Sequence, residues 1–334
     1  MTGRCRRGLL FAFAVAMAVR PLWAAPPTTP KTGQVEYKPA ANEAIVPELF
    51  HLEAHTFAYQ THPVATSAKS FTISQVTFPS PVVTPHKNNN TVHCEYFRPV
   101  GPGPFPGVVV LHILGGDFDL SRLVCRTFAS HGISSLFLIM PYYGPRAEPG
   151  ISTSMIDADP RQTVKGMTQA VLDIRRGAAW LAAQEEVDPK RLGVMGISLG
   201  GITAALAVTA EPRFEKAFLM LAGGDVAQIA WESPLVNELK AKWEADGGTR
   251  ESLVELLKPV DPVTYGENIG DRKIMMFNSL NDEIVPRACT DALWKAFGEP
   301  EIVWVDAGHY SVARFIFDAL AKATRFFQED GNGS

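Results

Sequence analysis

Runs of consecutive apolar residues alternate with amphipathic segments along most of this chain. Residues 107–114 and 191–197 are almost wholly apolar, which is typical of strands that are covered on both faces of a sheet. Residues 71–78 and 91–97 alternate between apolar and polar positions, which predicts two half-exposed strands joined by a polar turn. Further strands are predicted at 133–140, 216–221, 273–277 and 301–305.

The segments between these strands predict helices, at 121–131, 164–184, 199–209, 287–297 and 312–327. Strands that alternate with helices form right-handed crossovers. The order therefore predicts an α/β fold with a mostly parallel central sheet and helices on both faces. After the sixth strand, residues 225–260 break the order with a polar helical stretch at 231–257. We expect a helical insertion there, over the C-terminal edge of the sheet, where it would cap a pocket.

The first 25 residues have the pattern of a secretory signal peptide. Three arginines precede an apolar run at 9–19, and Ala24-Ala25 offers a cleavage site with small residues. An uncleaved anchor is the alternative, although Arg20-Pro21 interrupts the segment before it reaches transmembrane length. We expect a periplasmic or secreted protein, without stable membrane insertion after cleavage. Residues 26–70, rich in Pro, Thr and Ala, predict a linker and an N-terminal extension.

Composition limits the partners of this protein. Loss of the four leader arginines moves the formal net charge from −4 to −8, and a mildly acidic body argues against a nucleic-acid partner. Cys94, Cys125 and Cys289 remain, so either one intramolecular disulfide forms or the thiols are buried. No Cys or His pair has the spacing of a zinc site, and we expect neither a metal nor another cofactor. The oligomeric state stays open.

Residues 191–201 carry the strongest chemical signal in the chain. Gly196-x-Ser198-x-Gly200 follows an apolar run and precedes a helical one. In this pattern a serine nucleophile lies on a sharp turn from strand to helix, where the glycines leave room for a strained backbone. A match of five residues also arises by chance, and Ser198 would then be an ordinary serine in a turn.

Two later strands end in residues that could assist this serine. Asp282 follows the apolar run at 273–277, and His309 follows the run at 301–305. Because the carboxyl ends of the strands in an open α/β sheet gather its ligand-binding loops, we expect both side chains near Ser198. The alternatives to Asp282 are Glu283, Asp306 and Asp261, and the alternative to His309 is His112.

The order Ser, Asp, His is the order found in the α/β-hydrolase superfamily. Over residues 71–328 the chain resembles that superfamily. It is most similar to the dienelactone-hydrolase and acetyl-xylan-esterase-like branch, on the sequences Leu-His-Ile-Leu-Gly-Gly at 111–116 and Asn-Asp-Glu-Ile-Val-Pro at 281–286. The resemblance implies an α/β-hydrolase catalytic domain over 71–328.

The resemblance also implies a role for each of three residues. Ser198 would be the nucleophile, His309 the general base and then acid, and Asp282 the residue that holds the imidazole. A neutral hydroxyl is a poor nucleophile until a base removes its proton, and an imidazole is such a base near neutral pH. The expected activity is that of a serine hydrolase that cleaves small-molecule carboxylic esters through an acyl-enzyme intermediate.

Charge that develops on the acyl oxygen needs hydrogen-bond donors. The backbone N–H of Leu199 is one candidate, and the other is that of Leu114, or of Ile113, which stands where a glycine is common. Aromatic residues could line the substrate pocket or could serve in packing alone. These candidates are Tyr142, Tyr143 and Trp231.

The same three residues serve several reactions, so other functions stay open. A serine peptidase or a thioesterase is the nearest alternative. We expect esters rather than peptides because the chain shows no propeller-like repeat region. A lipase is disfavoured by the polar insertion, and the relatives that use an Asp nucleophile are disfavoured by Ser198. A non-catalytic binding protein that retains the fold is the alternative from another class.

Overall fold

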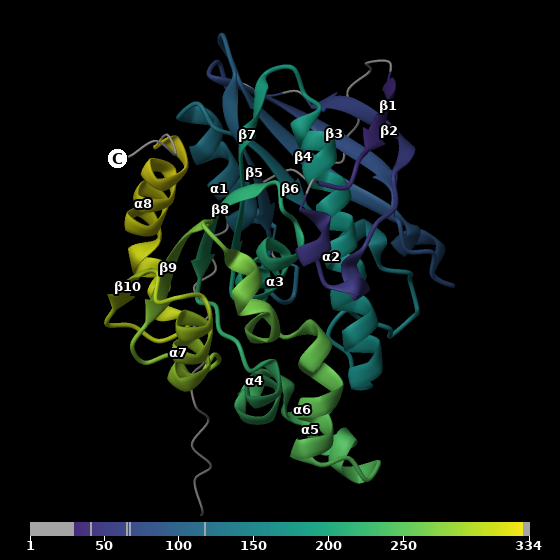
Figure 1. Cartoon of the computed structure of the whole chain (residues 1–334), viewed down its shortest axis with the longest axis vertical. Coiled ribbons are helices and arrows are strands. Elements are labelled where there is room, and N and C mark those ends of the chain that lie inside the picture. Colours follow the sequence, from purple (N-terminus) through teal and green to yellow (C-terminus); the bar gives the residue numbers. More distant parts are fainter. Residues whose placement is uncertain (1–29, 41, 65, 67, 117, 330–334) are drawn as a thin grey trace, which may run out of the picture.

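The computed structural model describes residues 30–329, except residues 41, 65, 67 and 117. The signal peptide that is predicted at 1–25 lies outside the described residues. Within them, ten strands form one sheet (Figure 1). Their order across the sheet is β1 (Lys31–Tyr37), β2 (His55–Val64), β3 (Phe71–Pro79), β4 (Thr91–Pro99), β6 (Ser134–Leu138), β5 (Phe105–Leu111), β7 (Val187–Ile197), β8 (Phe214–Met220), β9 (Lys273–Ser279) and β10 (Glu301–Val305).

The sheet has a parallel part and an antiparallel part. Strands β5 to β10 pair in parallel, whereas β1 to β4 form an antiparallel meander whose last strand pairs with β6. The central strands β5 and β7 are buried on both faces, as their continuous apolar sequences predict. The α/β fold with a mostly parallel sheet is therefore confirmed.

Helices cover both faces of the sheet, and 3₁₀ turns lie in several of the connecting segments. The α-helices are α1 (Asp119–Ser130), α2 (Pro160–Ala182), α3 (Leu199–Ala210), α4 (Val226–Glu232), α5 (Asn237–Ala245), α6 (Arg250–Leu257), α7 (Arg287–Ala296) and α8 (Ile316–Gln328). The 3₁₀ turns are η1 (Glu43–Ile45), η2 (Glu48–Phe50), η3 (Lys87–Asn90), η4 (Gly144–Arg146), η5 (Pro234–Val236), η6 (Lys258–Val260), η7 (Pro262–Ile269) and η8 (Ser311–Phe315).

Alternate residues of a buried strand supply two separate cores. Val109 points into the core that α2 and α3 share, whereas Val108 and Val110 point into the core of α1 and α8. Between β8 and β9 the chain forms α4, α5 and α6, which are grouped at one end of the molecule (Figure 1). No helix in the described part of the chain is long and apolar enough to cross a membrane.

The segment before residue 71 differs from the prediction. A linker and extension were expected over 26–70, but from Lys31 onward this segment adds β1 and β2 to the sheet. Its alternate apolar side chains, among them Val35, Tyr37 and Phe57, are buried. The linker prediction is wrong for this part because an apolar pattern of period two, diluted by Thr, Gln and Glu, outweighs the Pro-rich composition.

The three cysteines of the described chain are free and buried. They are Cys94, Cys125 and Cys289. Desolvation raises the pKa of the Cys125 thiol, which keeps it protonated and unreactive at neutral pH. Of the two possibilities that the sequence left open, the structure has buried thiols.

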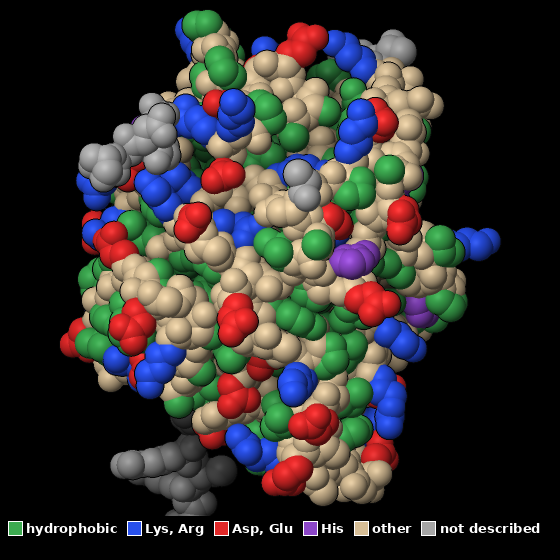
Figure 2. All heavy atoms as spheres, in the orientation of Figure 1, with side chains coloured by type: hydrophobic (Ala, Val, Ile, Leu, Met, Phe, Trp, Pro, Cys, Tyr) green, Lys and Arg blue, Asp and Glu red, His purple; other side chains and the backbone are tan. Residues whose placement is uncertain are grey.

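Charged side chains of both signs are intermingled on the surface. On the face that Figure 2 shows, Lys and Arg side chains lie among Asp and Glu side chains, without a large area of one sign on that face.

Two ion pairs in the described part of the chain are fully buried, and one of them, Arg146 with Asp173, lies beneath the turn after β6. Arg146 donates through Nη2 to Asp173 Oδ2 of α2 over 2.7 Å, and neither side chain is exposed. Ser80 donates to the other carboxylate oxygen over 2.6 Å, and Arg146 also donates to the carbonyl of Ile139 over 3.0 Å. The ion pair therefore links η4 to α2, and both of its side chains are inaccessible to water.

We predict that Arg146→Met lowers the free energy of unfolding by about 3–5 kcal/mol, because it leaves the Asp173 carboxylate buried and unpaired. Lys38→Met is the matched control. It removes the exposed pair with Glu36, in which the side chains are 70% and 58% exposed, and should cost less than about 1 kcal/mol. Urea unfolding measures both, and equal losses would contradict the prediction.

Candidate active site

The turn between β7 and α3 holds Ser198 in a strained conformation. Its φ is 55° and its ψ is −119°, in a region that residues other than glycine rarely adopt. A Cβ at Gly196 would collide with the backbone of Gly200, and a Cβ at Gly200 would lie 2.6 Å from the carbonyl oxygen of His112. Both glycines are therefore needed for the helix to start this close to the sheet.

Ser198, His309 and Asp282 form one hydrogen-bonded chain. His309 Nε2 lies 2.9 Å from Ser198 Oγ, and His309 Nδ1 lies 2.8 Å from Asp282 Oδ2. Oδ1 of the same carboxylate accepts the backbone N–H groups of Ile284 and Val285, over 2.9 and 2.8 Å. These two bonds fix the carboxylate, so that Nδ1–H donates to it and Nε2 is free to accept the serine proton.

The alternatives to Asp282 lie elsewhere or act otherwise. Glu283 accepts the backbone N–H of His309 through Oε2 over 2.8 Å, which holds the main chain rather than the imidazole. Asp306 accepts from the side chain of Asn281 over 2.8 Å. Asp261 accepts the backbone N–H of Val226 over 3.0 Å, at the start of α4. The contact of Glu283 with His309 had no signal in the sequence beyond its place beside Asp282.

His112, the alternative to His309, lies under the loop after β5. Its Nε2 accepts the backbone N–H of Met140 over 3.1 Å, so its proton is on Nδ1, which donates to the carbonyl of Ile113 over 2.8 Å. Burial lowers the pKa of His112 to about 4, which keeps it neutral at neutral pH. His112 therefore positions the loop and does not reach Ser198.

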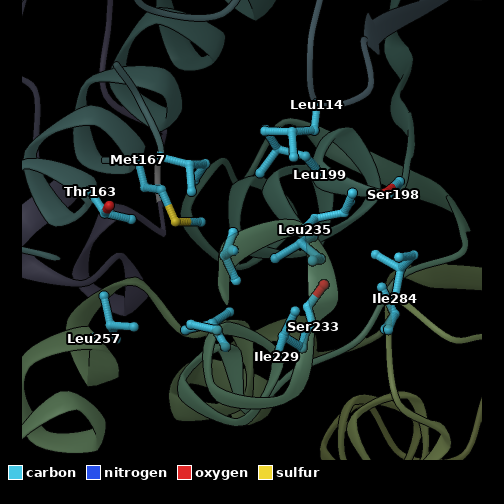
Figure 3. A pocket seen from close by; sticks show the side chains of 16 residues that line it. Leu114, Thr163, Met167, Ser198, Leu199, Ile229, Ser233, Leu235, Leu257 and Ile284 are labelled. Atoms are coloured by element: carbon cyan, nitrogen blue, oxygen red, sulfur yellow. The ribbon is translucent and has the colours of Figure 1, made fainter. Parts of the chain in front are cut away.

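This contact also separates the two candidate donors of that loop. In a planar trans peptide, the carbonyl of Ile113 and the N–H of Leu114 point in opposite directions. Because His112 holds that carbonyl, the N–H of Leu114 points away from His112. Leu114 lines the pocket beside Ser198 together with Leu199, the first residue of α3 (Figure 3). The structure thus favours Leu114 over Ile113.

An apolar cavity of about 110 Å³ opens beside Ser198, between α2 and the inserted helices (Figure 3). We call it the insertion-side pocket. It includes Thr163 and Met167 of α2, and no Asp, Glu, Lys or Arg is among the described residues that line it. The insertion contributes apolar side chains to its wall: Val226, Ile229, Ala230, Leu235, Val236 and Leu257. The expectation of a polar insertion is therefore wrong for the side that faces Ser198.

A second pocket, of about 510 Å³, is also lined by Ser198. We call it the histidine-side pocket, because His309 and Tyr310 line it. The rest of its wall is mainly aliphatic, and α1, η8, α8, the loop after β5 and the ends of β7 and β8 contribute to it. Leu114, Ser198 and Leu235 line both pockets. The serine hydroxyl therefore lies where two apolar hollows meet.

The three aromatic residues that were expected to line a substrate pocket line neither of these two. Tyr142 lies in a separate pocket, where it stacks edge-on with His86. The ring of Tyr143 packs against that of His112, with centroids 4.7 Å apart. The ammonium group of Lys240 lies over the ring of Trp231, 4.3 Å from the ring centroid. All three residues pack against the hydrophobic core, which is the second of the two roles that the sequence left open for them.

The residues that do line the pocket had a signal in the sequence. In α4, Val226, Ile229 and Ala230 recur at the spacing of one helical face, which the overall polarity of the insertion obscured. No group of three His, Cys, Asp or Glu side chains that could hold a metal ion was found among the residues that the structure describes.

Family models match two overlapping parts of the chain. The model of the prolyl oligopeptidase family matches residues 165–332, and the model of alpha/beta hydrolase domain containing 18 matches residues 64–233. Each match covers about half of the chain. The chain therefore belongs to the α/β-hydrolase superfamily and, within it, to the families that these two models describe. The resemblance to the superfamily is thereby confirmed.

Relatives in Mycobacterium tuberculosis share part of this sequence. One uncharacterized protein is 28% identical over 239 residues, which cover 66% of this chain and 55% of the relative. A second uncharacterized protein is 27% identical over 220 residues, which cover 64% of this chain and 66% of the relative. The match thus spans between about half and two thirds of the length of these curated relatives.

Solved structures of hydrolases share the fold. An acetyl xylan esterase from Paenibacillus sp. R4 superposes with a TM-score of 0.64 at 21% identity, over 80% of this chain and 88% of that chain. Acetyl xylan esterase 1 from Thermoanaerobacterium sp. JW/SL YS485 has a TM-score of 0.61 at 16% identity, with 79% and 87% covered. A dienelactone hydrolase described as putative, from Klebsiella pneumoniae, has a TM-score of 0.54 at 18% identity, with 77% and 99% covered. At these identities the likeness concerns the fold alone.

We predict that protonation of His112 destabilises the protein in acid. Its pKa is about 4 when folded, against an ordinary value of 6.5, so the unfolded chain takes up the proton first as the pH falls. Stability that is present above pH 6.5 is therefore lost towards pH 4, by about 3 kcal/mol for this group.

The control is His112→Gln, which can keep both hydrogen bonds but does not titrate. Other groups titrate alike in both proteins, so the difference in unfolding free energy between wild type and variant should fall by about 3 kcal/mol from pH 7 to pH 4. Urea unfolding at several pH values measures it. A difference that does not change with pH would show that His112 is not buried in its neutral form.

Proposed function

We propose that this protein is a serine hydrolase that cleaves carboxylic esters through an acyl-enzyme intermediate. The observation that carries the proposal is the hydrogen-bonded chain from Asp282 through His309 to Ser198, at the mouth of two pockets. A carboxylate, an imidazole and a hydroxyl in this order are the parts that activate a serine for attack on a carbonyl carbon.

The steps of the proposed reaction follow from the proton transfers that His309 can make. His309 Nε2 takes the proton of Ser198 as Oγ bonds to the carbonyl carbon, and the negative charge on the carbonyl oxygen is met by the N–H groups of Leu199 and Leu114. His309 then gives the proton to the leaving alkoxide, which departs as an alcohol. Water, deprotonated by the same imidazole, attacks the acyl-enzyme and releases the acid.

Esters are favoured over other substrates by the surroundings of Ser198. Both pockets are mainly aliphatic, and no Asp, Glu, Lys or Arg is among the described residues that line them. A peptide substrate presents N–H and carbonyl groups that need partners when they are buried. The esterase names of the similar structures agree with this proposal.

A serine peptidase is the second candidate, and the match to the prolyl oligopeptidase family favours it. The same activated serine would serve, with protonation of a leaving amine in place of an alkoxide. Turnover of peptide anilides that exceeds that of matched esters would favour this candidate.

We predict that a fluorophosphonate probe labels the wild-type protein once, at Ser198, because the activated hydroxyl attacks phosphorus as it would a carbonyl carbon. Ser198→Ala should abolish the adduct in a protein that remains folded. Ser74→Ala, a serine of β3 outside both pockets, is the control and should be labelled like wild type. Intact-mass spectrometry reads the result. A missing adduct on wild type, or one that survives Ser198→Ala, would refute the proposal.

We predict that substitutions of the adjacent residues Asp282 and Glu283 lower kcat to very different extents. Asp282→Asn should lower kcat for p-nitrophenyl acetate by about 10³–10⁴-fold, because an amide cannot accept from Nδ1–H as the carboxylate does and favours the wrong tautomer. Glu283→Gln keeps an acceptor for the N–H of His309 and should lower kcat by less than about tenfold. Equal losses, or a larger loss at Glu283, would mean that the acid is misassigned.

A further inference from the structure

Two pockets open beside Ser198 and share part of their walls. Leu114, Ser198 and Leu235 line both pockets, so they mark the boundary between them. Leu235 belongs to η5 of the insertion and stands among the pocket side chains close to Ser198 (Figure 3). A substrate whose carbonyl carbon lies at Ser198 Oγ would extend one group into each hollow.

The place of His309 decides which group enters which pocket. The imidazole must reach the oxygen of the leaving alcohol to protonate it, so the alcohol lies on the side of His309. His309 lines the histidine-side pocket, whereas Leu199, a donor to the acyl oxygen, lines the insertion-side pocket. The acyl chain therefore extends towards α2 and the insertion, and the alcohol extends towards α1 and α8.

The walls of both pockets are mainly aliphatic. Leu120, Val312 and Ile316 line the alcohol side, and Met167, Ile229 and Leu257 line the acyl side. An aliphatic wall stabilises a bound alkyl group by about 0.8 kcal/mol for each buried methylene. The polar residues of these walls are few, so most hydroxyl groups of a sugar would lose their water there without gaining partners. Tyr310, 64% exposed, and Leu235, 46% exposed, carry the apolar surface outward.

We propose that this site takes esters that are apolar on both sides, with an alkyl acyl group in the insertion-side pocket and an alkyl alcohol in the histidine-side pocket. The inference rests on the proposed function, because it assigns a substrate class to the same serine.

Two isomeric esters test the assignment. Ethyl hexanoate carries its long chain on the acyl side, and hexyl acetate carries it on the alcohol side. Ala230→Phe fills the acyl pocket and Ala313→Phe fills the alcohol pocket, each from a helical alanine that is not fully buried. Ala321→Phe makes the same change on an exposed residue of α8 outside both pockets. The readout is the ratio of kcat/KM for ethyl hexanoate to kcat/KM for hexyl acetate.

We expect wild type to turn over both isomers at least about tenfold faster than ethyl acetate or an acetylated sugar, in kcat/KM. Ala230→Phe should lower the ratio about tenfold, Ala313→Phe should raise it about tenfold, and Ala321→Phe should leave it unchanged. Should either variant fail to fold, Ile229→Ala and Ile316→Ala, which remove wall contacts without adding volume, should shift the ratio in the same two directions.

The outcomes separate this inference from the proposed function. A ratio that moves in one direction with both variants, or in the reverse pattern, overturns the assignment of the pockets. A wild type that prefers ethyl acetate or the acetylated sugar overturns the substrate class. In both cases a fluorophosphonate adduct on Ser198 leaves the hydrolase proposal intact. No adduct and no turnover of any ester refute the proposed function, and the inference falls with it.

Discussion

The backbone at Ser198 is the constraint on which the rest of the site depends. At φ 55° the chain turns from β7 into α3 within one residue, and the side chain is forced above the end of the sheet. Such a conformation costs of order 1–3 kcal/mol and persists only where its surroundings hold it. Here the surroundings are a buried parallel sheet and an α3 whose residues are all buried. The buried core therefore holds the strained backbone at Ser198, and the Ser198 hydroxyl is exposed to the pockets without any movement of the chain.

The partners of Ser198 are held by main-chain contacts rather than by side-chain packing. Asp282 is fixed by two backbone N–H groups, and the main chain of His309 is fixed by Glu283. On the opposite side, His112 orients the peptide before Leu114. Each group that would act on a substrate is thus oriented by a second group that would not itself touch the substrate. This is how a site on loops reaches the accuracy of a site on strands.

Parts of the fold and of the site could be predicted from the sequence alone. The apolar runs of β5 and β7 were predicted because a strand covered on both faces tolerates few polar residues. The strands at the N-terminus were missed, since the polar residues of β1 and β2 mask the alternation of apolar positions in these strands. The sequence left open whether the aromatic residues line a pocket or pack, because the direction in which a loop turns after a strand depends on what it packs against.

The sequence by itself determined the order of the elements and the residues that have the chemistry, because hydrophobic periodicity and the glycines around Ser198 are local properties. Only the tertiary structure decided which carboxylate meets His309, which way the loop at Leu114 faces, and that the insertion turns an apolar side towards Ser198. These three depend on contacts between residues far apart in the chain. The spacing of apolar residues in α4 marks an apolar face, but the direction of that face, like the other two features, is settled by what the neighbouring elements leave room for.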